Sequence, residues 1–244
     1  MNSNQLISIC SQVKNRFYQF KETFYENLDT INRYTNVTWT IVDIGSNDGI
    51  EDFFAQFLSS YSQNNINYYR IIEDLPYSIP IAKNFSLRLS NGYFLFNLDI
   101  DNYLDDIIDI ILSLNDTFGI RCNTINKGVY GRLGCHSDSL KIVGGYDESF
   151  LPAGGHENDL IRRLYNIGYV LNHIECKKMP IPNSKEETVK NFIDNHLSWQ
   201  EMNKINFYKT QNNSNNKTIN PNNNFTKASF MHNFKNKIEL LNSY

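Results

Sequence analysis

Two aspartates separated by one residue follow an apolar run in the segment FNLDIDN, residues 96–102. Alternate side chains of a strand point to the same side, so Asp99 and Asp101 can act together. Mn²⁺ and Mg²⁺ bind carboxylate oxygens, and phosphate oxygens and water commonly complete their coordination. The spacing is therefore typical of a metal site that receives a diphosphate, although a solvated strand end can have the same sequence. An EF-hand calcium loop is excluded, because its sixth position requires glycine and this chain has Leu104 there.

A carboxylate also precedes the polar turn of IVDIGSNDG, residues 41–49. At the end of a strand, Asp43 could contact a nucleotide base or a ribose. Asn, Asp and Ser equally suit an ordinary turn from a strand to a helix with an N-cap. The segment alone favours the simpler interpretation.

A third segment, GGYDESFLPAGGHENDLIRR at residues 144–163, combines glycines with titratable side chains. Gly144 and Gly145 lack a Cβ, which lets the backbone approach a ligand closely. The cluster at the start of the following helix consists of His156, Glu157 and Asp159. The helix dipole favours carboxylates at that end, so the cluster is compatible with simple capping. It equally fits a general base that takes the proton of an acceptor hydroxyl.

The elements that would position these side chains alternate along the first half of the chain. Apolar runs predict strands at 6–12, 37–45, 67–74 and 93–100. Apolar residues at helical spacing predict helices at 16–34, 51–61 and 78–90. This alternation predicts an α/β fold with a mainly parallel sheet flanked by helices. Ligands bind such sheets at the carboxyl ends of strands, where the strand order reverses. We therefore expect Asp43 and the pair Asp99/Asp101 to lie at that edge, with Lys14–Arg16 after the first strand.

The second half is less regular. A helix is predicted at 104–115 and another at 158–169, ended by Gly168, with glycine-rich loops between them. The Asn-rich stretch 211–225 is typical of a flexible linker, and 230–244 predicts a short terminal helix. We accordingly expect one domain at 1–205, with a nucleotide-binding half at 1–102 and an acceptor-side half at 103–205. Residues 206–244 would form a linker and the terminal helix.

Charge and cysteine use exclude several classes of protein. The formal charge of −3 and the isoelectric point near 6.0 argue against nucleic acid as a partner. The four cysteines form no CxxC pair, so a zinc knuckle or thioredoxin motif is excluded and reduced thiols of a cytoplasmic protein are expected. The sequence has no recognisable signal peptide and no apolar run that would span a membrane.

Taken in order, the segments LISICSQVKNR, IVDIGSNDG, SIPIAKNFSLRLSNGYFLFNLDIDN and GRLGCHSDSLKIVGGYDESFLPAGGHENDLIRRLYNIG resemble a known family. They are similar to the inverting glycosyltransferases of the GT-A fold, close to the bacterial family 2 enzymes and the galactosyltransferase C-terminal region. The resemblance covers residues 6–170. Each motif alone is weak, and their order and spacing together are specific.

The resemblance implies roles at the donor side. Asp101 matches the aspartate that ligates Mn²⁺ (or Mg²⁺) in the family. Asp99 matches the other aspartate of the motif, which contacts the ribose or the donor sugar and is expected to lie at the metal as well. Asp43 matches the acidic residue near the uracil and ribose. The further residues expected to bind the donor are Arg16, Lys83, Asn84 and Arg132.

On the acceptor side, AGGHENDL lies over the motif WGGEDxDL of the family. Glu157 takes the place of the catalytic aspartate, and Asp159 takes that of an acceptor-binding carboxylate and is the second candidate for the base. His156 stands where Glu is common. Gly144 and Gly145 join His156 and Asp159 as expected acceptor-binding residues.

The implied reaction is transfer of a hexose, with inversion, from a UDP-sugar to a saccharide or lipid-linked saccharide acceptor in bacterial surface polysaccharide synthesis. Relatives use a later histidine as a third metal ligand, for which His173 and His196 are the candidates. The substituted GGHENDL motif keeps open a catalytically degenerate module that binds a nucleotide sugar or scaffolds a partner. A Rossmann dinucleotide enzyme is disfavoured, because no GxGxxG follows the first strand. The Lys-containing C-terminal tail could touch an anionic membrane, although a solvated tail is the simpler interpretation.

Overall fold

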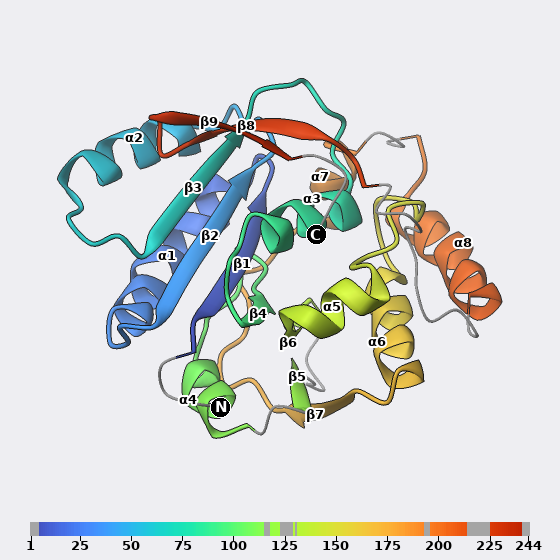
Figure 1. Ribbon diagram of the computed structural model, residues 1–244. Helices are drawn as coiled ribbons and strands as arrows, with labels where there is room; N and C mark the ends of the chain where they lie inside the picture. Colours follow the sequence, from blue (N-terminus) through green and yellow to red (C-terminus); the bar gives the residue numbers. More distant parts are fainter. Residues whose placement is uncertain are drawn as a thin grey trace.

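The computed structural model describes residues 5–114, 118–122, 129, 131–192, 196–213 and 225–240. Within them the strands form one sheet in the order β7-β5-β6-β4-β1-β2-β3-β8-β9 (Figure 1). The strands are β1 (Ile7–Val13), β2 (Val37–Asp43), β3 (Ile66–Ile71), β4 (Phe94–Asn97), β5 (Phe118–Cys122), β6 (Leu133–His136), β7 (Val170–Ile174), β8 (Ala228–His232) and β9 (Asn236–Leu240). The helices are α1 (Phe17–Ile31), α2 (Ile50–Ser60), α3 (Ile79–Arg88), α4 (Ile107–Ser113), α5 (Ser137–Val143), α6 (His156–Asn166), α7 (Lys185–Val189) and α8 (Trp199–Asn212).

The first four strands are parallel and alternate with α1, α2 and α3, which confirms the predicted α/β pattern. β1 lies between β2 and β4, so the strand order reverses at β1 and β4. The carboxyl ends of these strands therefore form the edge where α/β sheets bind their ligands.

The two faces of this half are covered by different helices. Phe20 and Phe24 of α1 pack with Phe54 of α2 against Trp39 of β2 in one apolar cluster. The other face is covered by α3, whose Phe85 belongs to a separate cluster with residues of β2, β3 and β8. Because α3 is buried on most of its sides, it can carry polar side chains into the interior at the edge of the sheet.

The second half extends the sheet past β4. β6 runs antiparallel to β4 and β5, and β7 is parallel to β5 at the edge of the sheet. The helices α5 and α6 pack with this part of the sheet through an apolar cluster that includes Leu140, Leu160 and Leu164. The second predicted helix of this half, at 158–169, corresponds to α6, which begins two residues earlier.

The prediction of a terminal helix at 230–244 is wrong. The chain instead forms the hairpin β8–β9, and β8 pairs antiparallel with β3 (Figure 1). The hairpin forms because β8 can bury Phe230 against Phe85 of α3, a tertiary contact that local helical spacing does not reveal. The proposed boundary at residue 205 falls inside α8, most of the predicted linker lies outside the described residues, and 241–244 do so as well.

Two sequence expectations concern membrane spans and cysteines. In the part of the chain that the structure describes, no helix combines the length and the apolarity needed to cross a membrane. All four cysteines are buried as free thiols, as expected.

Phe230→Ala is expected to lower the free energy of unfolding by about 3–5 kcal/mol, because it removes a fully buried aromatic side chain from the contact between β8 and α3. Urea denaturation followed by circular dichroism measures this change. Phe207→Ala, at an exposed position of α8, is the matched control and should stay within about 0.5 kcal/mol of the original protein. Equal effects of the two substitutions would mean that the hairpin contributes nothing to the fold.

Candidate active site

Asp99 lies just beyond β4 and is fixed by the end of the neighbouring strand. Gln12 of β1 donates a hydrogen bond from Nε2 to Asp99 Oδ1 at 2.9 Å, and Asn97 Nδ2 donates to the same oxygen at 3.2 Å. Gly131 faces the other oxygen so closely that a Cβ there would lie 1.8 Å from Asp99 Oδ2. The carboxylate is thus oriented by its surroundings while its side chain remains 29% exposed.

Asp101 is the second carboxylate of this edge. Its Oδ1 accepts a hydrogen bond from Asn102 at 2.5 Å, and its Oδ2 lies 3.5 Å from Asn183 Nδ2. Burial and the neighbouring charge of Asp99 raise the pKa of Asp101 to about 6. Two oxygen-rich side chains that repel each other in this way suit a hard divalent cation, which would remove the repulsion.

Lys83 of α3 joins this pair to the third sequence motif. Its buried Nζ lies 2.8 Å from Glu157 Oε1 and 3.5 Å from Asp99 Oδ1. Burial alone would lower the pKa of Lys83, but the two carboxylates outweigh this effect and raise it well above its ordinary value. A buried ammonium therefore places the segment Asp99–Asp101, called the DxD segment below, beside the start of α6.

Glu157 is held through only one of its two oxygens. His156 Nε2 lies 2.8 Å from Oε1, the oxygen that Lys83 also contacts. Burial would raise the pKa of Glu157, but its contacts with His156 and Lys83 outweigh this effect and hold that pKa far below its usual range. Among the described residues, no hydrogen bond or ion pair reaches Oε2. Glu157 is accordingly an ionised carboxylate with one oxygen available to a ligand.

The turn before α6 sets the position of Glu157. Gly154 and Gly155 have φ angles of +82° and +77°, which side chains with a Cβ rarely adopt. Asn206 of α8 donates hydrogen bonds from Nδ2 to the carbonyls of Leu151, Ala153 and Gly154 at 2.8–2.9 Å. This buried amide, for which the sequence has no recognisable signal, fixes the loop that leads into α6.

Asp159 is placed away from the open part of the site. Its Oδ2 accepts a hydrogen bond from Arg163 Nε at 2.9 Å and forms an ion pair with Arg163 Nη2, and Asn213 donates to its Oδ1 at 3.3 Å. Its side chain is only 2% exposed. The geometry therefore favours Glu157 over Asp159 as the base.

Three other residues of the sequence motifs have structural contacts. Asn84 donates to the carbonyl of Tyr146 and accepts from its N–H, both at 2.9 Å, so its amide holds the loop of the GGYDES segment. Gly144 and Gly145 have positive φ angles, and their N–H groups bond to carbonyls of the last turn of α5. The glycine pair therefore ends a helix.

The donor-side candidate Asp43 is fully buried at the end of β2. Its oxygens accept hydrogen bonds from Tyr68 Oη at 2.8 Å and Ser46 N at 2.7 Å, and Arg70 forms an ion pair with it. Asp43 lies at the predicted edge, but it shapes the turn and orients Arg70.

The two expected donor-binding arginines have different surroundings. Arg16 follows β1. Its guanidinium donates to the carbonyl of Ser184, just before α7, at 3.3 Å and to the hydroxyl of Thr188 within α7. Arg132 is fully buried, with Nε donating to Asn102 Oδ1 at 2.8 Å and Nη1 3.3 Å from Asp105. Arg16 stands at the edge of the site, and Arg132 supports the DxD loop from inside.

The candidate histidine ligands are not at the carboxylate pair. His173 shares a row of the sheet with Asn97 across β6 and β5, three strand spacings or about 14 Å away. His196 precedes α8, and no contact between it and Asp101 occurs among the described residues. Over these same residues no three acidic, His or Cys side chains cluster as a metal site. A cation held by Asp99 and Asp101 would need further ligands, such as phosphate oxygens and water, to complete its coordination.

Lys83→Met is expected to lower the free energy of unfolding by about 3 kcal/mol, because it leaves two carboxylates without their buried cation. Adding Glu157→Gln to this variant should recover part of the loss, since the carboxylate nearest the missing ammonium is then neutral. Chemical denaturation of the single and double variants at neutral pH measures the coupling. Strictly additive losses would show that Lys83 does not stabilise Glu157.

Comparison with known proteins is informative at the level of structure. No family model and no curated protein matches the chain. The mannosyltransferase PcManGT from Pyrobaculum calidifontis, in complex with GDP-Man and Mn²⁺, matches with a TM-score of 0.60 and 13% identity, over 85% of this chain and 69% of its own. S. aureus TarS in complex with UDP matches with a TM-score of 0.53 and 12% identity, over 85% of this chain and 71% of its own. The complex of TarS with UDP-GlcNAc gives 0.53 and 11% identity, over 89% and 74%. These likenesses confirm the expected GT-A fold.

Proposed function

We propose that the protein is an inverting glycosyltransferase that moves a hexose from a UDP-linked nucleotide sugar to a saccharide acceptor. The observation that carries this proposal is the contact of Lys83 with both Asp99 and Glu157, which brings the DxD segment and a candidate base into one site. The ligands of the matching structures, GDP-Man with Mn²⁺, UDP and UDP-GlcNAc, support a nucleotide-sugar donor.

Asp99 and Asp101 would hold Mn²⁺ or Mg²⁺ at the carboxyl end of β4. The metal would neutralise the diphosphate as a Lewis acid when it is bound. Arg16 stands near enough to Asp101 for the two charges to interact, so it would attract the same diphosphate. Asp43 would act on the nucleotide through the turn it shapes, because its own oxygens are engaged within the protein.

Glu157 would accept the acceptor proton at Oε2. The acceptor oxygen would then bond to the anomeric carbon from the face opposite the diphosphate, while the bond from that carbon to the diphosphate breaks and the nucleoside diphosphate leaves. This displacement inverts the configuration through a transition state with oxocarbenium character. Lys83 and His156 keep Oε1 in place during this step. An ionised carboxylate is the state that a base requires.

A nucleotide-sugar-binding module without catalysis is the second candidate. The ion pair of Glu157 with Lys83 at 2.8 Å favours it, because strong ion pairing weakens a carboxylate as a base. For the catalytic protein we propose lipid-linked saccharide acceptors and a role in surface polysaccharide synthesis at the cytoplasmic side of the membrane. The resemblance of the sequence motifs is the support for this setting.

UDP is expected to bind with Mn²⁺ present and to lose at least about tenfold in affinity in Asp101→Asn, because the negative charge of one of the two carboxylates that would hold the metal is removed. Isothermal titration calorimetry with Mn²⁺, and again with EDTA, measures both effects. Asp138→Asn, at an exposed position of α5, is the matched control and should bind as the original protein does. Equal UDP affinity in EDTA would contradict a metal-assisted donor site.

Glu157→Gln is expected to slow transfer, or slow hydrolysis of a UDP-hexose, by about 10²–10⁴-fold while UDP affinity changes little, because only proton acceptance is lost. Release of UDP from a panel of UDP-hexoses, with Mn²⁺, measures the rate. Full activity of the variant would place the base elsewhere. UDP binding without any turnover in the original protein would favour the binding module.

A further inference from the structure

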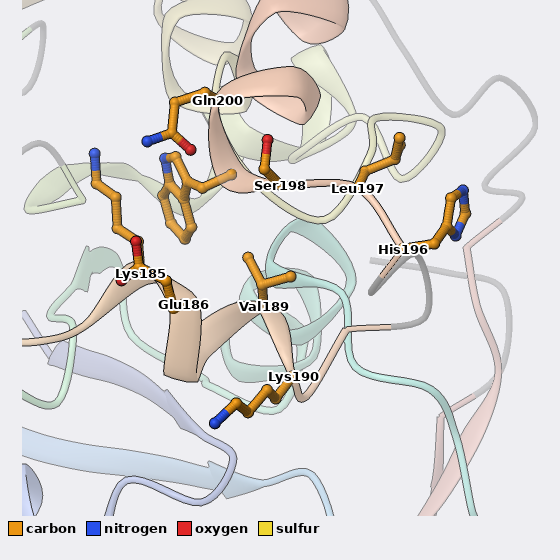
Figure 2. Close-up of a pocket in the computed structure, with 9 residues that line it drawn as sticks. Lys185, Glu186, Val189, Lys190, His196, Leu197, Ser198 and Gln200 are labelled. Carbon is orange, nitrogen blue, oxygen red and sulfur yellow. The ribbon is translucent and has the colours of Figure 1, made fainter.

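A groove of about 390 Å³ lies between α7 and the start of α8, outside the carboxylates described above (Figure 2). Lys185, Glu186 and Val189 of α7 lie on one side of the groove, and Ser198 and Gln200 at the start of α8 lie on the facing side (Figure 2). Trp199, between Ser198 and Gln200 in the chain, also lines the groove. The volume is within the range of roughly 300–1,000 Å³ that is usual for small-molecule pockets. The active-site assignment uses none of these six residues.

Trp199 gives the groove an apolar face with polar neighbours. Its ring packs against Phe192 with centroids 6.2 Å apart, and the Lys185 ammonium lies 5.7 Å from its centroid. Trp199 is half-buried, and Glu186 and Gln200 are exposed around it. An indole surface bordered by carboxylate, ammonium and amide groups suits a pyranose, which has an apolar C–H face and a rim of hydroxyls.

The α7 wall of the groove is tied to the donor side of the active site. Asn183 lies 3.5 Å from Asp101, and Arg16 donates to the carbonyl of Ser184 at 3.3 Å. Lys185 follows Asn183 by two residues, a reach of at most about 7 Å of chain. This end of the groove is therefore next to the expected metal and diphosphate.

The opposite wall belongs to the helix that supports the loop before Glu157. Trp199 begins α8, and Asn206, about 10 Å further along the same helix, bonds to that loop. Beneath the groove, Phe192 also stacks on buried Tyr77 at 5.6 Å, and the charge of Asp99 acts on the Tyr77 hydroxyl. The groove thus lies between two segments that contact the surroundings of the donor-side carboxylate and of the base: α7 follows Asn183, which is next to Asp101, and α8 carries Asn206.

We propose that this groove binds a sugar residue of the acceptor, an uncharged pyranoside stacked on Trp199 with its hydroxyls bonded to Lys185, Glu186 and Gln200. An uncharged sugar is favoured because the groove presents both signs of charge, and Lys190 is already paired with Glu187 at 2.6 Å. The inference rests on the proposed transferase function and names the acceptor site that this function requires.

The test uses the full chain with UDP and Mn²⁺, and the methyl β-glycosides of glucose, galactose and N-acetylglucosamine as probes. Saturation-transfer NMR measures the affinity of each glycoside. We expect saturable binding of at least one glycoside, weakened at least about tenfold in Trp199→Ala. Gln200→Ala, which changes an exposed side chain, should weaken binding about threefold. Phe207→Ala removes an exposed aromatic ring of α8 outside the groove and should bind as the original protein does.

The inference is overturned if none of the three glycosides binds, or if Trp199→Ala and Gln200→Ala both bind as tightly as the original protein. Calorimetry of UDP on the same samples separates the two proposals. UDP binding without glycoside binding removes the groove as an acceptor site and leaves the donor site intact. Absence of UDP binding removes the transferase proposal, whatever the glycosides do.

Discussion

The candidate site depends on one buried ammonium, that of Lys83. Removing an ion from water costs several kcal/mol even after the protein relaxes, so the side chain is stable there only while carboxylates compensate it. Those carboxylates come from the end of β4 and from the start of α6, and Glu157 lies 74 residues from Lys83 in the chain. The requirement to neutralise one charge therefore fixes the two motifs relative to each other before any ligand is present.

Buried asparagines supply a second layer of support. Three asparagine side chains each donate a hydrogen bond to, and accept one from, the backbone of a loop. Asn27 binds the loop at Asn102–Leu104 after the two aspartates, Asn84 binds the loop at Tyr146, and Asn206 binds the loop before α6. An amide side chain can satisfy an N–H and a C=O at once, which an irregular buried loop needs. The loops that carry the chemistry are thus irregular in backbone and still firmly held.

The alternation of apolar runs was sufficient to predict the first four strands, their helices and the edge at which Asp43, Asp99 and Asp101 lie. Those predictions succeeded because strands and helices that are buried in an α/β sheet have a recognisable local pattern of apolar residues. The engagement of Asp43 by Arg70 and the support of Asp99 by Gln12 could not be predicted, because these partners lie far apart in the sequence. The hairpin at 228–240 was misassigned for the same reason, since β8 gains its stability from β3 and Phe85.

The pairing of β8 with β3 also has a consequence for synthesis of the chain. Tyr69 pairs with His232, so the edge of β3 must wait for more than half of the protein to be made before it is covered. During that interval its open N–H and C=O groups are a template for strands of other molecules. Closing so long a loop is slow as well. The finished molecule ends its sheet instead at β9, where Asn236, Lys237 and Glu239 make the last strand unsuited to further addition.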